Sequence, residues 1–279
     1  MVRSDLIIDV GMHLGHDTRF YLAKGFKVAA VEANPDLVER AESTFAREIA
    51  DGRLQIFGVA IAEQRGIAPL AVAEQSGLSS LSRAEVERAE KHGMRFHYVD
   101  VPAVPFEEIL KEVGIPYYLK VDIEGFDRLC VQALRNFDER PAYVSMESSI
   151  KSPELRLGFD AIFDELAELW TLGYRRFKYV NQMRVHQLPD PPSEGWRFAQ
   201  PVASVDASGP FGKETPGIWE PVERTIVRGW ALRIQHELGA RNGRWASLPP
   251  GFLYRGLRSR VFKRPTGFFD LHASLGSID

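Results

Sequence analysis

The sequence predicts an α/β fold with a mostly parallel central sheet, helices on both of its faces, and a loop-rich and helical C-terminal extension. Strand-like and helix-like segments alternate up to about residue 180, which is typical of parallel sheets with right-handed crossovers. The first apolar run, 6–10, leads into a glycine-containing turn, and the second, 28–31, ends in an acid. A doubly wound fold that binds an adenosine-containing cofactor is expected to begin in this way.

Local residue chemistry predicts each element. Gly25 ends the first helix, because glycine readily adopts the left-handed conformation found after helix C-termini. Asn34 and Pro35 begin the second helix as N-cap and first helical residue. Residues 77–81 are expected to form a loop. The patterns predict strands at 6–10, 27–31, 54–62, 67–73, 97–104, 116–123, 142–147 and 175–180, and helices at 16–24, 35–49, 83–92, 106–113, 127–134, 159–173 and 223–238.

The composition of the chain changes after Asn181. Residues 189–221 contain seven of the 17 prolines, and Ser208–Gly217 has the turn chemistry of a lid. From Leu238 to Phe269 there is no acid, and seven Arg and Lys are interleaved with aromatic residues. We therefore predict a cofactor-binding core at 1–182, and an acceptor-side lid and C-terminal extension packed on that core at 183–279.

The overall composition narrows the class of protein. With 279 residues, 44% hydrophobic and 26% charged, the chain resembles an ordinary globular protein, and its net charge of −3 does not favour nucleic acid as a partner. No apolar run approaches the roughly 18 residues that span a bilayer. The single cysteine, Cys130, precludes an intrachain disulfide, and no signal-peptide pattern precedes the first strand. We expect a cytoplasmic protein with no membrane span.

The first loop distinguishes between cofactors. A dinucleotide fold requires Gly-x-Gly-x-x-Gly so that a diphosphate can approach the backbone, but His13 occupies the middle position here. S-adenosylmethionine has no phosphate, and its ammonium and sulfonium groups favour carboxylates. Asp9 supplies one carboxylate, Thr18 is placed to bond the methionine carboxylate, and Glu32 is placed to bind the ribose hydroxyls. These residues favour S-adenosylmethionine over NAD.

A second segment specifies the class further. The run Leu119-Lys-Val-Asp-Ile-Glu-Gly-Phe-Asp127 lies at the end of the predicted strand 116–123. Together with Asp9-Val-Gly11, Glu32-Ala-Asn-Pro35 and Ser79-Ser-Leu81, it closely resembles the FkbM family of S-adenosylmethionine-dependent methyltransferases. The matching motifs cover roughly residues 6–150. The resemblance implies a Rossmann-like class I methyltransferase core and methyl transfer, most often to an oxygen of a sugar or natural product.

The resemblance also assigns roles to residues. The reaction-side candidates that it implies are Lys120, Asp122 and Glu124. The cofactor-binding candidates are Asp9, Gly11, His13, Gly15, Thr18, Glu32, Ala33, Asn34, Ser79 and Ser80.

Methyl transfer to a hydroxyl requires removal of a proton, by a general base or with the help of a metal. Asp122 lies at the carboxyl end of a strand, where open α/β sheets bind ligands. Asp122, Glu124 and Glu147 form a candidate set for Mg²⁺, which prefers oxygen ligands. Base catalysis and metal assistance both stay open, and His272 is a further candidate base that would return to the site from the C-terminal region.

The acceptor is less constrained than the methyl donor. We expect a hydroxyl on a carbohydrate or glycosylated natural product. The basic, aromatic segment 241–264 fits either an anionic acceptor, such as a phosphorylated or lipid-linked glycan, or a solvated face packed on the core. Two alternatives to a methyltransferase are an NAD-linked oxidoreductase on a similar fold and a non-catalytic binding protein that retains the fold.

Overall fold

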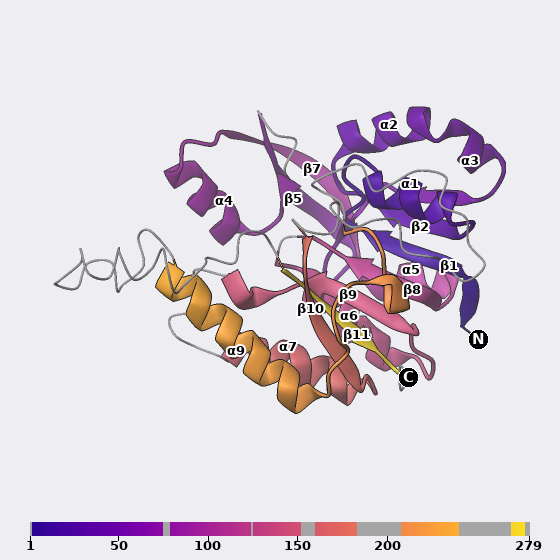
Figure 1. Ribbon diagram of the computed structural model, residues 1–279. Helices are drawn as coiled ribbons and strands as arrows, with labels where there is room; N and C mark the ends of the chain where they lie inside the picture. The colour runs from indigo at the N-terminus through magenta and orange to yellow at the C-terminus, as the bar shows by residue number, and fades with distance from the viewer. Residues whose placement is uncertain are drawn as a thin grey trace.

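A seven-stranded sheet forms the core of the computed structural model, which describes residues 2–74, 79–123, 125–151, 160–182, 208–239 and 269–276 (Figure 1). The neighbouring strands are parallel except at β11, which is antiparallel to both of its neighbours. This arrangement confirms the predicted α/β class. The strand order is β10 (Arg176–Asn181), β11 (Phe269–Ser274), β9 (Tyr143–Glu147), β8 (Pro116–Val121), β1 (Arg3–Val10), β2 (Lys27–Val31) and β3 (Leu54–Phe57).

Helices cover both faces of this sheet, because alternate side chains of each strand point to opposite sides. In β1, Ile7 packs in a cluster with α1 and α2, whereas Ile8 packs in another with α5, α6 and α7. The predicted cap of α2 is confirmed, because Asn34 Oδ1 accepts a hydrogen bond from the Asp36 N–H at 3.0 Å. The helices are α1 (His16–Ala23), α2 (Pro35–Thr44), α3 (Ala46–Ala50), α5 (Phe106–Val113), α6 (Asp127–Ala133), α7 (Asp160–Thr171) and α9 (Val222–Gly239).

A second, four-stranded sheet interrupts the alternation between β3 and α5. The expected strand 54–62 is in fact two strands in different sheets, because the chain leaves the main sheet after Phe57. Ser79 and Ser80, expected in a loop, pair antiparallel with β5. Periodicity alone does not tell which sheet a strand joins. The strand order is β4 (Ala60–Ile61), β7 (Phe96–Val104), β5 (Gly66–Ala73) and β6 (Ser79–Ser80), followed by α4 (Arg83–Lys91).

The C-terminal strand β11 corrects the predicted division at residue 182. Phe269–Ser274 inserts between β9 and β10, and all six residues are buried. The polar pattern of Asp270 and His272 does not resemble a central strand, so the sequence did not predict one. Part of the predicted extension therefore belongs to the core sheet.

The connector, which we define as Ser208–Pro221, packs against the core. The Asp17 carboxylate accepts hydrogen bonds from the N–H groups of Ser208 at 2.9 Å and Gly209 at 2.8 Å. Phe211 stacks on the Tyr118 ring with centroids 4.3 Å apart. The expected lid at Ser208–Gly217 is thus a covering of the core, because its backbone and aromatic side chain are held by buried groups (Figure 1).

A buried carboxyl group supports the turn that follows β9. Glu165 of α7 accepts hydrogen bonds from the Ser149 N–H, at 2.9 Å, and from the Ser149 hydroxyl. Burial raises the pKa of Glu165 to about 7, although the Ser149 hydrogen bonds oppose this.

In the ranges that the structure describes, no helix is long and apolar enough to cross a bilayer.

Substitution Phe211→Ala tests whether the connector belongs to the folded core. Loss of the buried ring should lower the free energy of unfolding by about 3–5 kcal/mol, as for other buried aromatic truncations. Urea denaturation measures this change. The matched control is Ile218→Ala in the same connector, where the side chain is 78% exposed and a change below about 0.5 kcal/mol is expected. Equal effects of the two substitutions would contradict the packed connector.

Substitution Glu165→Gln tests the buried carboxyl group. Because the folded pKa of about 7 exceeds the ordinary value of 4.5, ionisation between these pH values stabilises only the unfolded chain. The parent should therefore lose stability relative to the variant as pH rises from about 4.5 to about 7, with no further divergence above that range. Urea denaturation across pH measures the difference, with exposed Glu42→Gln as control. Parallel pH curves for parent and Glu165→Gln would be inconsistent with this assignment.

Candidate functional site

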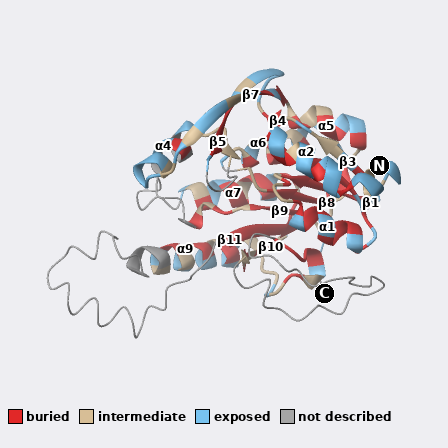
Figure 2. Ribbon diagram, turned by 90° about the horizontal axis from the view of Figure 1, so that it is seen from above, coloured by how far each residue is buried: buried red, intermediate tan, exposed pale blue. Residues whose placement is uncertain are grey.

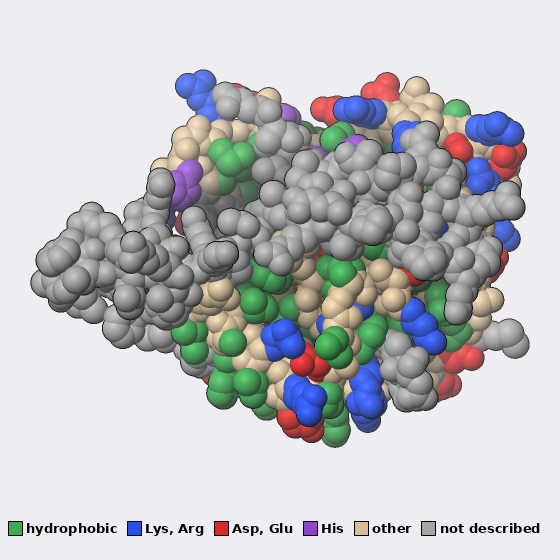
Figure 3. All heavy atoms as spheres, viewed as in Figure 1, with side chains coloured by type: hydrophobic (Ala, Val, Ile, Leu, Met, Phe, Trp, Pro, Cys, Tyr) green, Lys and Arg blue, Asp and Glu red, His purple; other side chains and the backbone are tan. Residues whose placement is uncertain are grey.

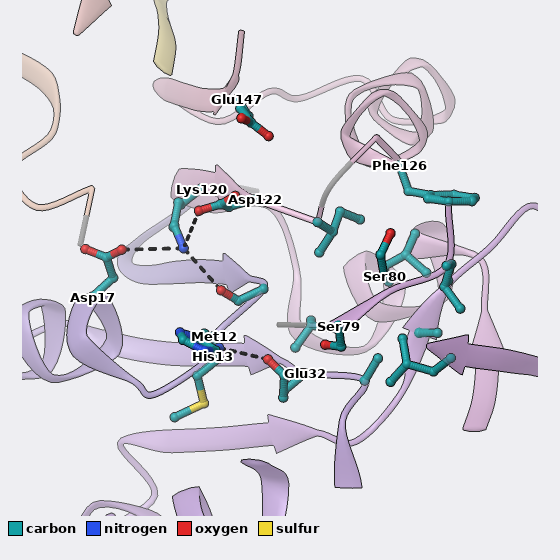
Figure 4. A pocket seen from close by; sticks show the side chains of 18 of the residues that line it. Met12, His13, Asp17, Glu32, Ser79, Ser80, Lys120, Asp122, Phe126 and Glu147 are labelled. Carbon is teal, nitrogen blue, oxygen red and sulfur yellow. Dashed lines mark hydrogen bonds and ion pairs between the residues drawn. The ribbon is translucent and has the colours of Figure 1, made fainter. Parts of the chain in front are cut away.

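A cavity of about 570 Å³ opens at the carboxyl ends of β1, β2 and β8, with the second sheet contributing one wall (Figure 4). Open α/β sheets bind ligands at this edge. The lining residues are Gly11, Met12, His13, Leu14, His16, Asp17, Val31, Glu32, Ala33, Val59, Ala60, Ile61, Leu70, Ser79, Ser80, Leu81, Lys120, Asp122, Ile123, Phe126, Glu147 and Gln182.

The loop after β1 forms the floor of the cavity and depends on Gly11. A Cβ at Gly11 would lie 1.9 Å from the carbonyl oxygen of Asp122, and φ of Gly11 is +81°. The Asp122 N–H donates to the Val10 carbonyl at 2.9 Å, which holds the two strand ends together. His13 has φ of +50°, a left-handed conformation in which histidine is enriched among non-glycine residues. The positive φ angles and the close approach of Asp122 therefore explain why glycine occupies position 11 and histidine is tolerated at position 13.

Glu32 joins two segments of the cavity wall. Its Oε2 accepts from the His13 N–H at 2.8 Å, and its Oε1 accepts from the Asn34 N–H at 2.9 Å. Burial raises the pKa of this carboxyl group, while the backbone donors oppose the shift. Figure 4 shows the carboxylate at the cavity, where the lone pairs that its backbone donors do not use can accept from a ligand hydroxyl.

Lys120 lies at the centre of a buried charge cluster. Its Nζ lies 3.1 Å from Asp9 Oδ1. The same atom lies 3.4 Å from Asp17 Oδ2 and 3.8 Å from Asp122 Oδ2 (Figure 4). It also donates to the Gly11 carbonyl at 3.2 Å. Burial alone would lower the pKa of Lys120, but the carboxylates outweigh it and hold that pKa well above its usual value. Lys120 therefore stays protonated, and when all three carboxylates are ionised the cluster is net negative.

Asp9 and Thr18 act behind the cavity wall. Both are fully buried, and the Thr18 hydroxyl donates to Asp9 Oδ2 at 2.6 Å. Burial raises the pKa of Asp9, and the Lys120 ammonium opposes the shift. The Thr18 hydroxyl, which we expected to bond the methionine carboxylate, is buried and donates to Asp9. Asp9 orients Lys120 instead of lining the cavity.

Carboxylate and amide side chains line the other end of the cavity. The Asp122 side chain is 33% exposed, and Glu147 and Gln182 line the same end. Gln182 Nε2 donates to Asp270 Oδ1 at 2.7 Å, which fixes the orientation of the amide. Burial and the neighbouring Asp122 carboxylate hold the pKa of Asp270 well above its ordinary value. Asp122 is thus the accessible carboxylate between the cluster and this end.

The structure brings most of the predicted site residues to one cavity. The predicted residues that line it are Gly11, His13, Glu32, Ala33, Ser79, Ser80, Lys120, Asp122 and Glu147, whereas Asp9, Gly15, Thr18 and Asn34 lie behind its wall. Gly15 packs against the Phe45 ring, and Asn34 caps α2. Glu124 lies outside the described residues.

The prediction for His272 needs correction, and the described residues give no support to the predicted Mg²⁺ site. His272 does not line the cavity, and burial and Lys178 lower its pKa to about 3, so it is not placed to act as the base. In the described part of the chain, no three His, Cys, Asp or Glu residues form a metal-binding group. Asp122 and Glu147 reach the cavity, and Glu124, the third member of the expected Mg²⁺ set, lies outside the described residues, so this set stays a prediction.

Sequence reasoning missed other members of the site. Asp17 and Gln182 belong to long-range contacts that no local motif encodes. Apolar side chains from Val59–Ile61 reach the cavity because the chain changes sheets there. An acid in the first turn of the predicted helix 16–24, directly after the glycine-containing loop, was the available signal for Asp17.

Comparison with solved structures gives remote similarities, with 21 chains matching significantly, and no curated protein matches the chain. The FkbM methyltransferase of Methylobacillus flagellatus is 14% identical over 64% of this chain and 40% of that one, with a TM-score of 0.41. A precorrin-6y C5,15-methyltransferase of Geobacter metallireducens is 11% identical over 65% and 70%, with a TM-score of 0.35. An S-adenosylmethionine-dependent methyltransferase of Geobacter sulfurreducens, solved with S-adenosyl-L-homocysteine, is 9% identical over 98% and 84%, with a TM-score of 0.33.

The comparison of the sequence with protein-family models identifies the family of the chain. The model of the FkbM methyltransferase domain matches residues 9–176, more than half of the chain. The match begins at the Asp9 loop, includes the Asp122 segment and extends into β10. It confirms the resemblance inferred from the four motifs, and the chain belongs to the FkbM methyltransferase family.

Proposed function

We propose that the cavity binds S-adenosylmethionine. The observation that carries this proposal is the charge at its floor, where one buried ammonium, Lys120, is surrounded by three carboxylates. An excess of carboxylates attracts the cationic sulfonium and ammonium groups of this methyl donor. The Glu32 carboxylate supports the assignment, because an acid at the end of the second strand is the group that binds ribose hydroxyls in such folds. The volume of about 570 Å³ is typical of small-molecule sites.

The same features disfavour NAD. A diphosphate at the loop after β1 would meet the carboxylates around Lys120 and the side chain of His13, which occupies the middle glycine position of the dinucleotide motif. Asp17 is additionally held by two backbone donors, so its carboxylate is fixed near the loop. Both charge and shape therefore favour the sulfonium cofactor.

We further propose that the reaction is methylation of a hydroxyl group, with Asp122 as proton acceptor. S-adenosylmethionine, when bound, supplies an activated methyl group on sulfur. The acceptor oxygen forms a bond to that methyl carbon while the carbon–sulfur bond breaks with its electron pair going to sulfur, and the hydroxyl proton passes to Asp122. Asp122 suits this role because its side chain is accessible at the carboxyl end of β8.

The acceptor in this proposal is a carbohydrate or a glycosylated natural product. Glu147 and Gln182 line the end of the cavity beyond Asp122 and offer the carboxylate and amide groups that bind sugar hydroxyls. Asp270 holds the Gln182 amide in one orientation, so that its carbonyl oxygen is directed by a buried partner. Pre-oriented groups of this kind reduce the entropy lost on binding.

Substitution Glu32→Gln tests the cofactor assignment by calorimetry. The amide nitrogen of the glutamine would face the backbone N–H donor of His13 or Asn34 and could not accept its hydrogen bond. The side chain would therefore no longer bond both the loop and the ribose. We expect affinity for S-adenosylmethionine to fall at least about tenfold. The control, exposed Glu63→Gln, should retain the parent affinity. Tight NAD binding by the parent, with no binding of S-adenosylmethionine, would overturn the assignment.

Substitution Asp122→Asn tests the proton acceptor. The amide keeps the size of the side chain but does not accept the hydroxyl proton, so we expect methyl transfer to fall by about 10²–10⁴-fold. Affinity for S-adenosylmethionine should change by less than about fivefold, because Asp122 is the most distant carboxylate from Lys120 at 3.8 Å. Labelled S-adenosylmethionine and an extract fractionated by acceptor class provide the assay. Unchanged turnover with the true acceptor would remove Asp122 from the mechanism.

A further inference from the structure

Helix α9 packs small and polar residues against the core, together with the partly buried Val222, Ile226 and Leu232. Thr225, Gly229 and Arg233 are buried and follow one another at four-residue spacing, so they share one side of the helix. A Cβ at Gly229 would lie 2.8 Å from the Tyr179 hydroxyl oxygen, so the helix approaches β10 closely there. Arg233 Nη1 donates to the Ile150 carbonyl at 2.8 Å. The side of α9 that faces the core thus includes a close contact with β10 at Gly229 and the buried guanidinium group of Arg233.

The other side of α9 carries large apolar residues. Val227 is 64% exposed, Trp230 is 40% exposed and Ile234 is 47% exposed. Their three- and four-residue spacing places them in one line, which we name the α9 outer stripe. Figure 2 shows α9 at the edge of the molecule, and Figure 3 shows hydrophobic side chains among charged ones on its surface. An aligned apolar stripe on an exposed helix indicates an interaction surface.

The sequence that follows α9 indicates the charge of the partner. Residues 240–268 contain seven Arg and Lys and no Asp or Glu, and they also contain Trp245, Phe252, Tyr254, Phe262 and Phe268. The whole chain has a net charge of −3, so this positive charge is local. Basic residues interleaved with aromatic residues, next to a helix that exposes apolar side chains, are typical of contacts with anionic lipid headgroups.

We propose that the α9 outer stripe docks on an anionic membrane surface. The apolar side chains enter the boundary between headgroups and acyl chains, and the positive charge C-terminal to α9 favours anionic lipid. A second copy of the chain is the weaker occupant, because three aligned side chains are far fewer than the roughly 20–30 residues a side of a standard protein interface. The proposal is independent of the methyl acceptor, because the stripe lies outside the cavity lining.

Co-sedimentation of the full-length protein with vesicles tests the proposal. The parent should bind equimolar phosphatidylglycerol–phosphatidylcholine vesicles at least about tenfold more tightly than phosphatidylcholine vesicles, and should lose this preference in 1 M salt. The double variant Val227→Glu/Ile234→Glu should lose at least about tenfold in affinity for the anionic vesicles. The control Ile67→Glu, at a 69% exposed position on β5, should bind as the parent does. Thermal unfolding followed by circular dichroism verifies that the variants are folded.

Any of the following outcomes would contradict the proposal. Failure of the parent to bind anionic vesicles, equal binding to both vesicle types, or equal binding by parent and double variant would each exclude docking through the stripe. A concentration-dependent dimer that the double variant abolishes, without vesicle binding, would assign the stripe to a second copy. If the glutamates unfold the chain, Val227→Ser/Ile234→Ser replaces them, with the same loss of vesicle binding expected.

Discussion

The buried ammonium of Lys120 is the interaction on which the site depends. A lysine removed from water is stabilised only by close counter-charges, and Asp9, Asp17 and Asp122 lie within 3.8 Å of it. These carboxylates come from β1, α1 and the end of β8, so the ion pairs join three elements at one point. Removing Lys120 would leave the buried Asp9 and Asp17 carboxylates without their counter-charge, which costs about 3–5 kcal/mol in such pairs.

The same cluster links the C-terminal part of the fold to the cavity. Asp17 contacts Lys120 and also accepts hydrogen bonds from the backbone N–H groups of Ser208 and Gly209 at the start of the connector. The connector in turn covers the sheet beside Tyr118, and β11 completes that sheet between β9 and β10. Asp270 on β11 then orients Gln182 at the far end of the cavity. Residues after 207 therefore shape a site whose motifs all lie before residue 148.

The two ends of the cavity are lined by different kinds of chemical group. At one end the loop after β1, Glu32 and the second sheet enclose a space suited to a nucleoside. At the other end Asp122, Glu147 and Gln182 line the cavity with oxygen and amide groups, where we propose that the acceptor binds. The family supplies the reaction type, methyl transfer, and the local geometry supplies the proposed division between donor and acceptor. Outside this cavity, α9 exposes Val227, Trp230 and Ile234, while its Val222, Ile226 and Leu232 pack against the core.

The sequence by itself determined the family, most elements before residue 182 and the loop that forms the cavity floor. Those features depend on local periodicity and short motifs, such as the Asn34 cap and Gly11, which neighbouring residues alone specify. Only the tertiary structure decided that β11 enters the core sheet, that Thr18 is committed to Asp9, and that Lys120 stays protonated. Each of these depends on burial or on contacts between distant segments, and a residue's burial and charge partners are properties of the folded chain.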